Sequence, residues 1–202
     1  ASKLAFVQQP TSATAGATIS PAVTVAVQDA GGNTVTTSSA SIATAIGTNP
    51  SSGTLSGTKT VSAVSGVATF STLSVDKAGT GYTFTAASTG LTGTTSSSFN
   101  INVAAVSASQ STVSAAPTSV AADGSTTSTL TVTALDAFGN PVSGQSVSLG
   151  GAPGTSTITT VSGTTNGSGV ATFTAKTTTA GSYTYTAMIG ATTVLQTASV
   201  TF

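Results

Sequence analysis

Apolar and small polar residues alternate along short stretches of this 202-residue chain. Val23-Thr-Val25-Ala-Val27 is one example, and Leu130-Thr-Val132-Thr-Ala134 is another. A period of two is typical of a strand with one face buried and the other in water. Gly, Asn, Asp and Pro, which favour turns, separate these segments, and no stretch shows a helical period. The pattern therefore predicts an all-β fold.

The same pattern predicts where the strands lie. Those expected in the first half are Lys3–Val7, Ala22–Gln28, Ser41–Ile46, Thr58–Val61, Val67–Leu73, Tyr82–Ala87 and Ser97–Val103. Those expected in the second half are Thr112–Ala116, Ser128–Leu135, Gln145–Leu149, Thr157–Val161, Val170–Ala175, Ser182–Ile189 and Val194–Phe202. About seven short strands per hundred residues, without helices, is the pattern of an immunoglobulin-like β-sandwich.

The two halves of the chain repeat the same landmarks in the same order. Ser-Gly-Val-Ala-Thr-Phe occurs at 65–70 and again at 168–173, and Asp29-Ala-Gly-Gly-Asn33 aligns with Asp136-Ala-Phe-Gly-Asn140. The alignment preserves the buried parity of the strands, which a slip of one residue would reverse. A period of about 100 residues fits a whole small domain. We therefore predict two tandem domains, 1–104 and 105–202.

The junction between the halves, Val103–Gln110, contains no Gly or Pro and joins a last strand to a first strand. So short a connection predicts an elongated pair with limited bending. The first twenty residues lack the basic start and apolar centre of a signal peptide, which favours a mature or excised segment. No apolar run is long enough to cross a bilayer.

Repeated apolar positions predict the two cores. The expected core residues are Val25, Phe70, Tyr82, Phe84, Val132, Phe173, Tyr183 and Tyr185. We expect Phe70 and Phe173 to be almost wholly buried, against Val25 and Val132. Aromatic rings at positions 84 and 185 stand where antibody domains place their second Cys, so they should fill the centre of each sandwich.

One tyrosine stands at or near the start of the sixth expected strand in each half. Tyr82 and Tyr183 stand where this architecture places its tyrosine corner, whose hydroxyl bonds back to the backbone upstream. The alternative is that both are simply core aromatics at a strand edge. Four polar residues of the repeat, Asp29, Asn33, Asp136 and Asn140, are expected in turns, where Asp caps local backbone N–H groups.

These motifs resemble bacterial Ig-like domains of large surface proteins. The second half, through Leu130-Thr-Val-Thr-Ala-Leu-Asp-Ala-Phe-Gly-Asn-Pro-Val142 and Gly169-Val-Ala-Thr-Phe173, is similar to the invasin and intimin type of repeat. The first half is similar to a related repeat of very long cell-surface proteins, through Lys3-Leu-Ala-Phe-Val-Gln-Gln-Pro10. The resemblance implies a spacer that holds a distal binding domain away from the cell, and an extracellular or cell-surface location.

Charge is nearly absent from the chain, which holds four Lys and four Asp and no Arg, Glu, His or Cys. Nucleic-acid binding requires clustered Lys and Arg, so it is excluded. Ser-His-Asp catalysis is excluded by the lack of His, and Asp29 and Asp136 stand in different domains, so they cannot form a catalytic carboxylate pair. We therefore expect no enzyme activity and no catalytic residues.

Metal and cofactor chemistry finds little support in the sequence. Transition-metal ligands and the Asp-rich calcium loop are absent, so we expect no metal site and no cofactor. A cation held by one Asp and backbone carbonyls between the domains stays open as an alternative. Asn166-Gly-Ser168 is a glycosylation sequon, but Asn-Gly also favours a tight turn, which is the preferred interpretation.

The sequence is compatible with three functions. The leading hypothesis is a non-enzymatic extracellular spacer or stalk module of a large bacterial surface protein, whose partners are neighbouring Ig-like domains or other copies of itself. The second is a self-assembling filament subunit, because edge strands would carry few charged residues to block pairing. The third, a glycan-binding accessory module, would require surface aromatics, and the chain has no Trp and only three Tyr.

Overall fold

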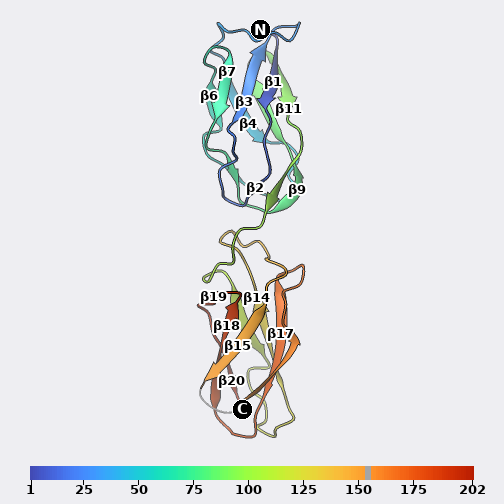
Figure 1. Ribbon diagram of the computed structural model, residues 1–202, viewed down its shortest axis with the longest axis vertical. Helices are drawn as coiled ribbons and strands as arrows, with labels where there is room; N and C mark the ends of the chain where they lie inside the picture. Colours follow the sequence, from blue (N-terminus) through green and yellow to red (C-terminus); the bar gives the residue numbers. More distant parts are fainter. Residues whose placement is uncertain (153–155) are drawn as a thin grey trace. The chain divides into compact units, whose positions relative to one another are not determined.

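The computed structural model describes residues 1–152 and 156–202. The chain divides into two compact units, Ala1–Val103 (unit 1) and Ala104–Phe202 (unit 2). Strands β1–β12 belong to unit 1 and β13–β20 to unit 2, as the colours of Figure 1 show. None of the described residues lies in a helix. Each unit is a β-sandwich of the immunoglobulin-like class, so the predicted fold class is confirmed.

Unit 1 is built from strands in the blue-to-green part of Figure 1. They are β1 (Lys3–Gln8), β2 (Ala13–Thr14), β3 (Val23–Gln28), β4 (Ser41–Ile46), β5 (Leu55–Ser56), β6 (Thr60–Ser62), β7 (Val67–Phe70), β8 (Ser74–Val75), β9 (Gly79–Tyr82), β10 (Phe84–Ser88), β11 (Leu91–Thr95) and β12 (Phe99–Asn102). The main hydrogen-bonded path runs β6-β4-β10-β11-β1-β3-β7, and β2-β12-β9 and β5-β8 form smaller sheets. A parallel contact of β1 with β11 connects the β1-β3-β7 layer to the β4-β10-β11 layer.

Unit 2 has a simpler arrangement. Its strands are β13 (Thr112–Ala116), β14 (Ser128–Thr133), β15 (Val147–Ala152), β16 (Thr157–Ser162), β17 (Val170–Lys176), β18 (Ser182–Ile189), β19 (Thr192–Thr193) and β20 (Ala198–Thr201). One sheet has the order β13-β14-β17-β16, and in the other β18 pairs with β15, β19 and β20. In the nomenclature of immunoglobulin constant domains, the first sheet corresponds to strands A, B, E and D. The second sheet, through β15, β18 and β20, corresponds to strands C, F and G.

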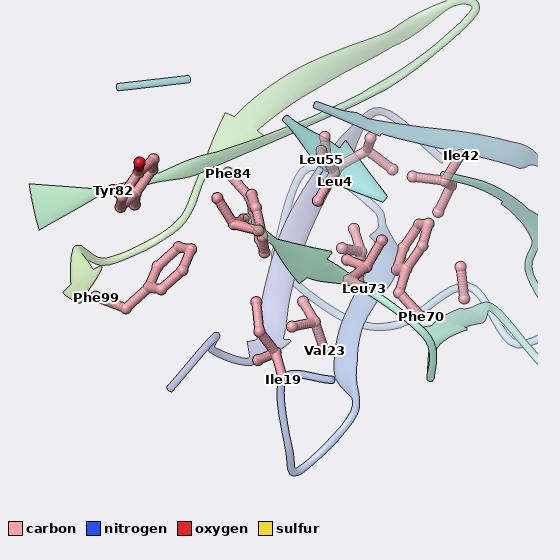
Figure 2. Close-up of a cluster of buried hydrophobic side chains, with 14 of the residues drawn as sticks. Leu4, Ile19, Val23, Ile42, Leu55, Phe70, Leu73, Tyr82, Phe84 and Phe99 are labelled. Carbon is pink, nitrogen blue, oxygen red and sulfur yellow. The ribbon is translucent and has the colours of Figure 1, made fainter. Parts of the chain in front are cut away.

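The core of unit 1 lies between its layers, and Figure 2 shows the side chains that fill it. Tyr82, Phe84 and Phe99 gather on one side of this view, and the Phe84 and Phe99 rings lie 4.8 Å apart between centroids at a tilt of 56°. Phe70 lies on the other side, near Leu73. Offset and tilted aromatic pairs of this kind add stability beyond the area that they bury.

The core of unit 2 repeats this arrangement with different residues. Phe173 and Tyr185 are fully buried, as are Leu130 and Val132 on β14. Tyr183 packs edge-on against Phe202, with ring centroids 5.4 Å apart. The eight positions expected in the cores are all buried, with exposed fractions of 4% or less.

The strand register places the repeated Phe differently from the expected contacts. Phe70 lies opposite Val23, and Ala68 lies opposite Val25. In unit 2 Phe173 lies opposite Leu130, while Ala171 lies opposite Val132. Each Phe therefore has as its direct cross-strand neighbour the residue two positions before the expected Val, and that Val lies in the same core cluster.

Unit 1 contains more strands than its sequence predicts. The expected strand Tyr82–Ala87 is two strands, because β9 pairs with β12 whereas β10 pairs with β4 and β11. Strand β11 (Leu91–Thr95) was not expected, since its mostly exposed side chains show no clear buried face. It forms a hairpin with β10 after Gly90, which has a positive φ of 76°.

The repeated hexapeptide owes its glycine to steric crowding. Gly66 and Gly169 have φ of 80° and 76°, in the left-handed region that favours glycine. A Cβ at Gly66 would lie 2.5 Å from the Val35 carbonyl oxygen, and one at Gly169 would lie 2.5 Å from the Ala134 carbonyl oxygen. The Gly66 and Gly169 carbonyls accept hydrogen bonds from the backbone N–H groups of Val27 and Ala134, respectively. These bonds connect the ends of β3 and β14 to the turn.

Candidate functional site

Charged side chains are dispersed over both units. Lys3 lies in β1 and Lys176 in β17, both half-buried, while Lys59 is exposed before β6 and half-buried Lys77 follows β8. Among the described residues, no group of three His, Cys, Asp or Glu could hold a metal ion. The described chain also has no helix that is long and apolar enough to span a membrane.

The turn after β14 is the most developed polar constellation of unit 2. The Asp136 carboxylate is fully buried, and its Oδ1 accepts hydrogen bonds from the backbone N–H groups of Phe138 (2.8 Å) and Asn140 (2.9 Å). Its Oδ2 accepts from the Asn140 side-chain amide (2.8 Å) and from the Ala104 backbone N–H (3.0 Å). Four donors thus converge on one carboxylate, and one of them lies 32 residues upstream.

These contacts decide the ionisation of Asp136. Burial alone would raise the pKa of the carboxyl, because desolvation disfavours the charged form. Hydrogen bonds from the Asn140 side chain and from the Ala104, Asn140 and Phe138 backbone outweigh burial, and the net pKa is lowered. The turn therefore holds a negative charge inside unit 2, which the dipoles of these N–H groups stabilise.

The equivalent turn of unit 1 lies at the surface. Asp29 is partly exposed and Asn33 is exposed. Asp29 Oδ1 accepts from the Asn33 backbone N–H at 2.9 Å, and the Asn33 side-chain amide donates to Oδ2 at 3.1 Å. The Asn33 side-chain bond, followed by backbone bonds within the turn, lowers the pKa of Asp29. All four polar residues expected in turns thus lie in turns, and both Asp cap local N–H groups.

Tyr82, at the end of β9, and Tyr183, near the start of β18, both form a corner hydrogen bond. The Tyr82 hydroxyl donates to the Lys77 carbonyl at 2.8 Å, and the Tyr183 hydroxyl donates to the Thr179 carbonyl at 3.1 Å. Each acceptor lies four or five residues upstream, as in a tyrosine corner. Burial raises the pKa of Tyr82, so this hydroxyl stays protonated and remains a donor.

The rings at the centre of the two sandwiches differ by one hydroxyl. Phe84 and Tyr185 are both fully buried. The Tyr185 hydroxyl is also buried, and within the described ranges it has no hydrogen-bond partner. A buried hydroxyl without a partner costs free energy, so unit 2 carries a local penalty at a position where unit 1 has none.

Two further polar turns serve the backbone. Asp123 accepts from the backbone N–H groups of Ser125 and Thr126 and from the Thr126 hydroxyl, which together hold its pKa well below the usual range. The Asn166 side-chain oxygen accepts from the N–H groups of Ser168 (2.9 Å) and Val170 (3.0 Å). The glycosylation sequon therefore lies in a tight turn that uses its Asn side chain.

A surface hollow of about 360 Å³ lies beside β4 in unit 1. It is lined by small and polar side chains, including Thr44, Asn49 and Lys59, with Ile46 and Leu55 as its larger apolar members. No aromatic side chain lines it. Sugar-binding sites rely on aromatic faces and convergent polar groups, so this hollow gives no support to glycan binding.

A comparison with protein families addresses unit 2. Residues 110–202 match the model of the bacterial Ig-like domain, group 1. Unit 2 is a bacterial Ig-like domain. This agrees with its sandwich order and with its resemblance in sequence to surface-protein repeats. No curated protein matches the chain at the sequence level.

Solved structures show the same fold along the whole chain. The Escherichia coli adhesin FdeC is 21% identical over 98% of this chain and 62% of its own, with a TM-score of 0.55. Yersinia pseudotuberculosis InvD is 25% identical over 99% of this chain and 56% of its own, with a TM-score of 0.52. Invasin, described as a bacterial integrin-binding protein, is 22% identical over 99% of this chain and 38% of its own, with a TM-score of 0.48.

The chain therefore spans less than two thirds of each of these solved chains. The likenesses to FdeC and InvD have TM-scores above 0.5. Their identities are low, so they establish the fold of both units and leave the specific role of this chain to its own residues.

Sequence reasoning missed several polar residues that Ig-like unit 2 buries. Ser111, Ser128 and Thr165 are buried, and their hydroxyls bond to the Leu135, Pro117 and Val142 carbonyls, respectively. Ser and Thr are so frequent in this chain that composition hides such positions. The Ala104 N–H was missed for a different reason, since a backbone donor leaves no mark on residue type.

Proposed function

We propose that the chain is a non-enzymatic spacer of an extracellular or cell-surface protein, in which Ig-like sandwiches in series carry other domains. One observation supports this most directly: the polar groups with the most developed geometry, the Asp turns and tyrosine corners, are all engaged in holding backbone. A binding or catalytic site would direct such groups toward a ligand.

The domain division is part of the proposal. Each unit, Ala1–Val103 and Ala104–Phe202, would fold on its own core and add its length to a stalk. The family of unit 2 and the adhesin fold of FdeC support an extracellular setting. Neighbouring Ig-like domains are the partners that such a module requires.

A surface-display experiment tests the spacer role. One, two or three copies of the chain would be placed between a membrane anchor and a reporter epitope on a bacterial surface. We expect antibody access to the epitope to increase with copy number, while adhesion to epithelial cells stays at the level of the anchor alone. Adhesion that scales with copy number would contradict the proposal and indicate a binding module. A flexible Gly-Ser linker of equal length provides the matched control.

A second candidate function, self-assembly into filaments, is favoured by the edge strand β16. This strand pairs with β17 on one side, carries neither charge nor Pro, and exposes 66% of Val161. Native proteins usually block such edges with Lys, Pro or bulges, and of these β16 shows only an irregular register between Thr160 and Ser162.

Electron microscopy of the purified chain tests this candidate. Long regular fibres that vanish in Val161→Lys would support assembly through β16. Met188→Lys is the matched control, because Met188 is similarly exposed on β18, which pairs on both of its sides. Isolated particles at all concentrations would exclude the filament.

A further inference from the structure

The two Asp-x-x-Gly-Asn turns share their backbone hydrogen bonds one for one. Four pairs of bonds correspond. Within the turns, Asp29 N donates to Asn33 O as Asp136 N donates to Asn140 O (both 2.9 Å), and Gly32 N donates to Asp29 O as Gly139 N donates to Asp136 O (3.2 and 3.1 Å). Beside the turns, Val35 N donates to Val27 O as Val142 N donates to Ala134 O (2.8 and 2.9 Å), and Ser2 N donates to Gln28 O as Ser107 N donates to Leu135 O (2.7 and 2.8 Å). The last pair belongs to the peptide that enters each unit. The turns and the first bond of each entering peptide therefore correspond, although the path from Ser107 to Thr112 is two residues longer than the path from Ser2 to its strand equivalent Ala5.

Unit 2 adds one bond that uses a residue further upstream. The Ala104 N–H, three residues before Ser107, donates to Asp136 Oδ2 at 3.0 Å, and Val106 forms a β-bridge with Asp136. The same step back from Ser2 reaches a position two residues ahead of Ala1. The bonds that Asp29 accepts in unit 1 come from its own turn.

We propose that the Asp-x-x-Gly-Asn turn is a docking site for the peptide backbone that enters each unit, with Asp29 binding the N–H of a polypeptide joined ahead of Ala1 as Asp136 binds Ala104. The ligand is a main-chain amide, so any residue except Pro suits it. In unit 2 the step of three residues from Ser107 back to Ala104 reaches the carboxylate, and the step from Ser2 to the docking position has the same length. The inference goes beyond the spacer function and holds whether or not the chain acts as a spacer.

The chemistry of the site accounts for this ligand. A carboxylate accepts bonds at both oxygens, and a charged acceptor makes each bond shorter and stronger than a neutral one. In unit 2 the docked peptide accompanies full burial of Asp136, whereas Asp29 remains partly exposed. Docking should therefore order the entering peptide and cover the turn.

Two extended chains test the site in unit 1. One carries Gly-Ser-Val-Ala-Ala ahead of Ala1, and the matched control carries Gly-Ser-Val-Pro-Ala, which lacks the N–H at the docking position. We expect the Asp29 pKa, followed by carboxyl ¹³C NMR, to be lower in the first chain. Unit 1 should also melt about 4 °C higher in the first chain than in the control. Identical pKa values and melting temperatures in the two chains would overturn the proposal.

The same logic tests unit 2 within the natural sequence. Ala104→Pro removes the donor, so the Asp136 pKa should rise and unit 2 should melt at a lower temperature, whereas Ala105→Pro should leave the Asp136 pKa unchanged. If the Pro variants fail to fold, the rate of amide hydrogen exchange at Ala104 in the unmodified chain provides the alternative test of docking. The docked N–H should exchange at least tenfold more slowly than an unstructured amide, and unprotected exchange would contradict docking.

Discussion

Unit 1 and unit 2 build the same Asp-x-x-Gly-Asn turn, yet Asp29 is partly exposed while Asp136 is fully buried. The turn itself is set by local sequence, because the Asp caps N–H groups within four residues in both units. In unit 2 the entering peptide also contributes the Ala104 N–H, and the carboxylate that accepts it is buried. The same Asp-x-x-Gly-Asn turn is thus a surface cap in one unit and a buried polar centre in the other.

The cores of the two units differ in the aromatic ring at their centre. Unit 1 fills its centre with Phe84, while unit 2 uses Tyr185 and buries a hydroxyl that has no partner among the described residues. Unit 2 therefore combines a strongly bonded buried carboxylate with a poorly satisfied buried hydroxyl. The repeated Phe70 and Phe173, by contrast, have nearly the same burial and register.

The largest expected effect comes from the position at which the units agree. Phe70→Ala and Phe173→Ala should each cost about 3 to 5 kcal/mol of unfolding free energy in their own unit, because each leaves a large core cavity. Scanning calorimetry should show one transition lowered and the other nearly in place. A common shift of both transitions would mean that the chain unfolds as a single cooperative unit.

The Asp turns should show the sharpest difference between the units. Asp136→Ala removes the acceptor of four hydrogen bonds, of which the two from Asn140 are buried and those from Phe138 and Ala104 are part-buried. We therefore expect unit 2 to lose about 2 to 4 kcal/mol of unfolding free energy. Asp29→Ala should cost unit 1 clearly less, because water can reach its turn. Chemical denaturation of both variants measures the two losses, and equal losses would show that burial of Asp136 adds nothing.

Acid should weaken unit 2 more than unit 1. The pKa values of Asp123 and Asp136 in unit 2 and of Asp29 in unit 1 all lie below the ordinary value of 3.8. The stabilisation is therefore complete above that value and is lost as the pH falls through the folded-state pKa of each group. Calorimetry between pH 5 and pH 2 should show the larger fall in melting temperature for unit 2. The difference should shrink in Asp123→Asn.

The smallest effect concerns the central rings. Tyr185→Phe removes the buried hydroxyl and copies unit 1, so it should leave unit 2 as stable or raise its unfolding free energy by about 1 kcal/mol. The reciprocal change Phe84→Tyr should destabilise unit 1 by a similar amount. A clear loss of stability in Tyr185→Phe would show that the hydroxyl does have a partner.

Sequence reasoning recovered the features that periodicity records. Alternation identified the buried faces of β3 and β14, and the repeated Gly-Asn turns identified the ends of these strands. It missed β11, whose residues are largely exposed. It also missed that the expected sixth strand of unit 1 divides into β9, which pairs with β12, and β10, which pairs with β4. Exposed hairpins and sheet switches depend on tertiary pairing and leave no periodic signal.

The candidate sites show the same limit. The sequence placed Asp29 and Asp136 in equivalent turns but could not separate an exposed carboxylate from a buried one. That difference depends on a backbone N–H at Ala104, 32 residues away in the chain. Strand position alone offers two interpretations of Tyr82 and Tyr183, a tyrosine corner or simple core aromatics, and the hydroxyl bonds to the Lys77 and Thr179 carbonyls distinguish them.

The placement of the four lysines has a consequence for resistance to proteases. Trypsin-like enzymes cut after Lys or Arg, and this chain offers them Lys3, Lys59, Lys77 and Lys176. Lys176 ends β17, between β14 and β16, and Lys3 lies in β1 between β3 and β11, so cleavage there must await unfolding. Lys59 alone is exposed, before the edge strand β6. Digestion of the native chain should therefore begin in unit 1, and the lifetime of unit 2 should follow its unfolding equilibrium.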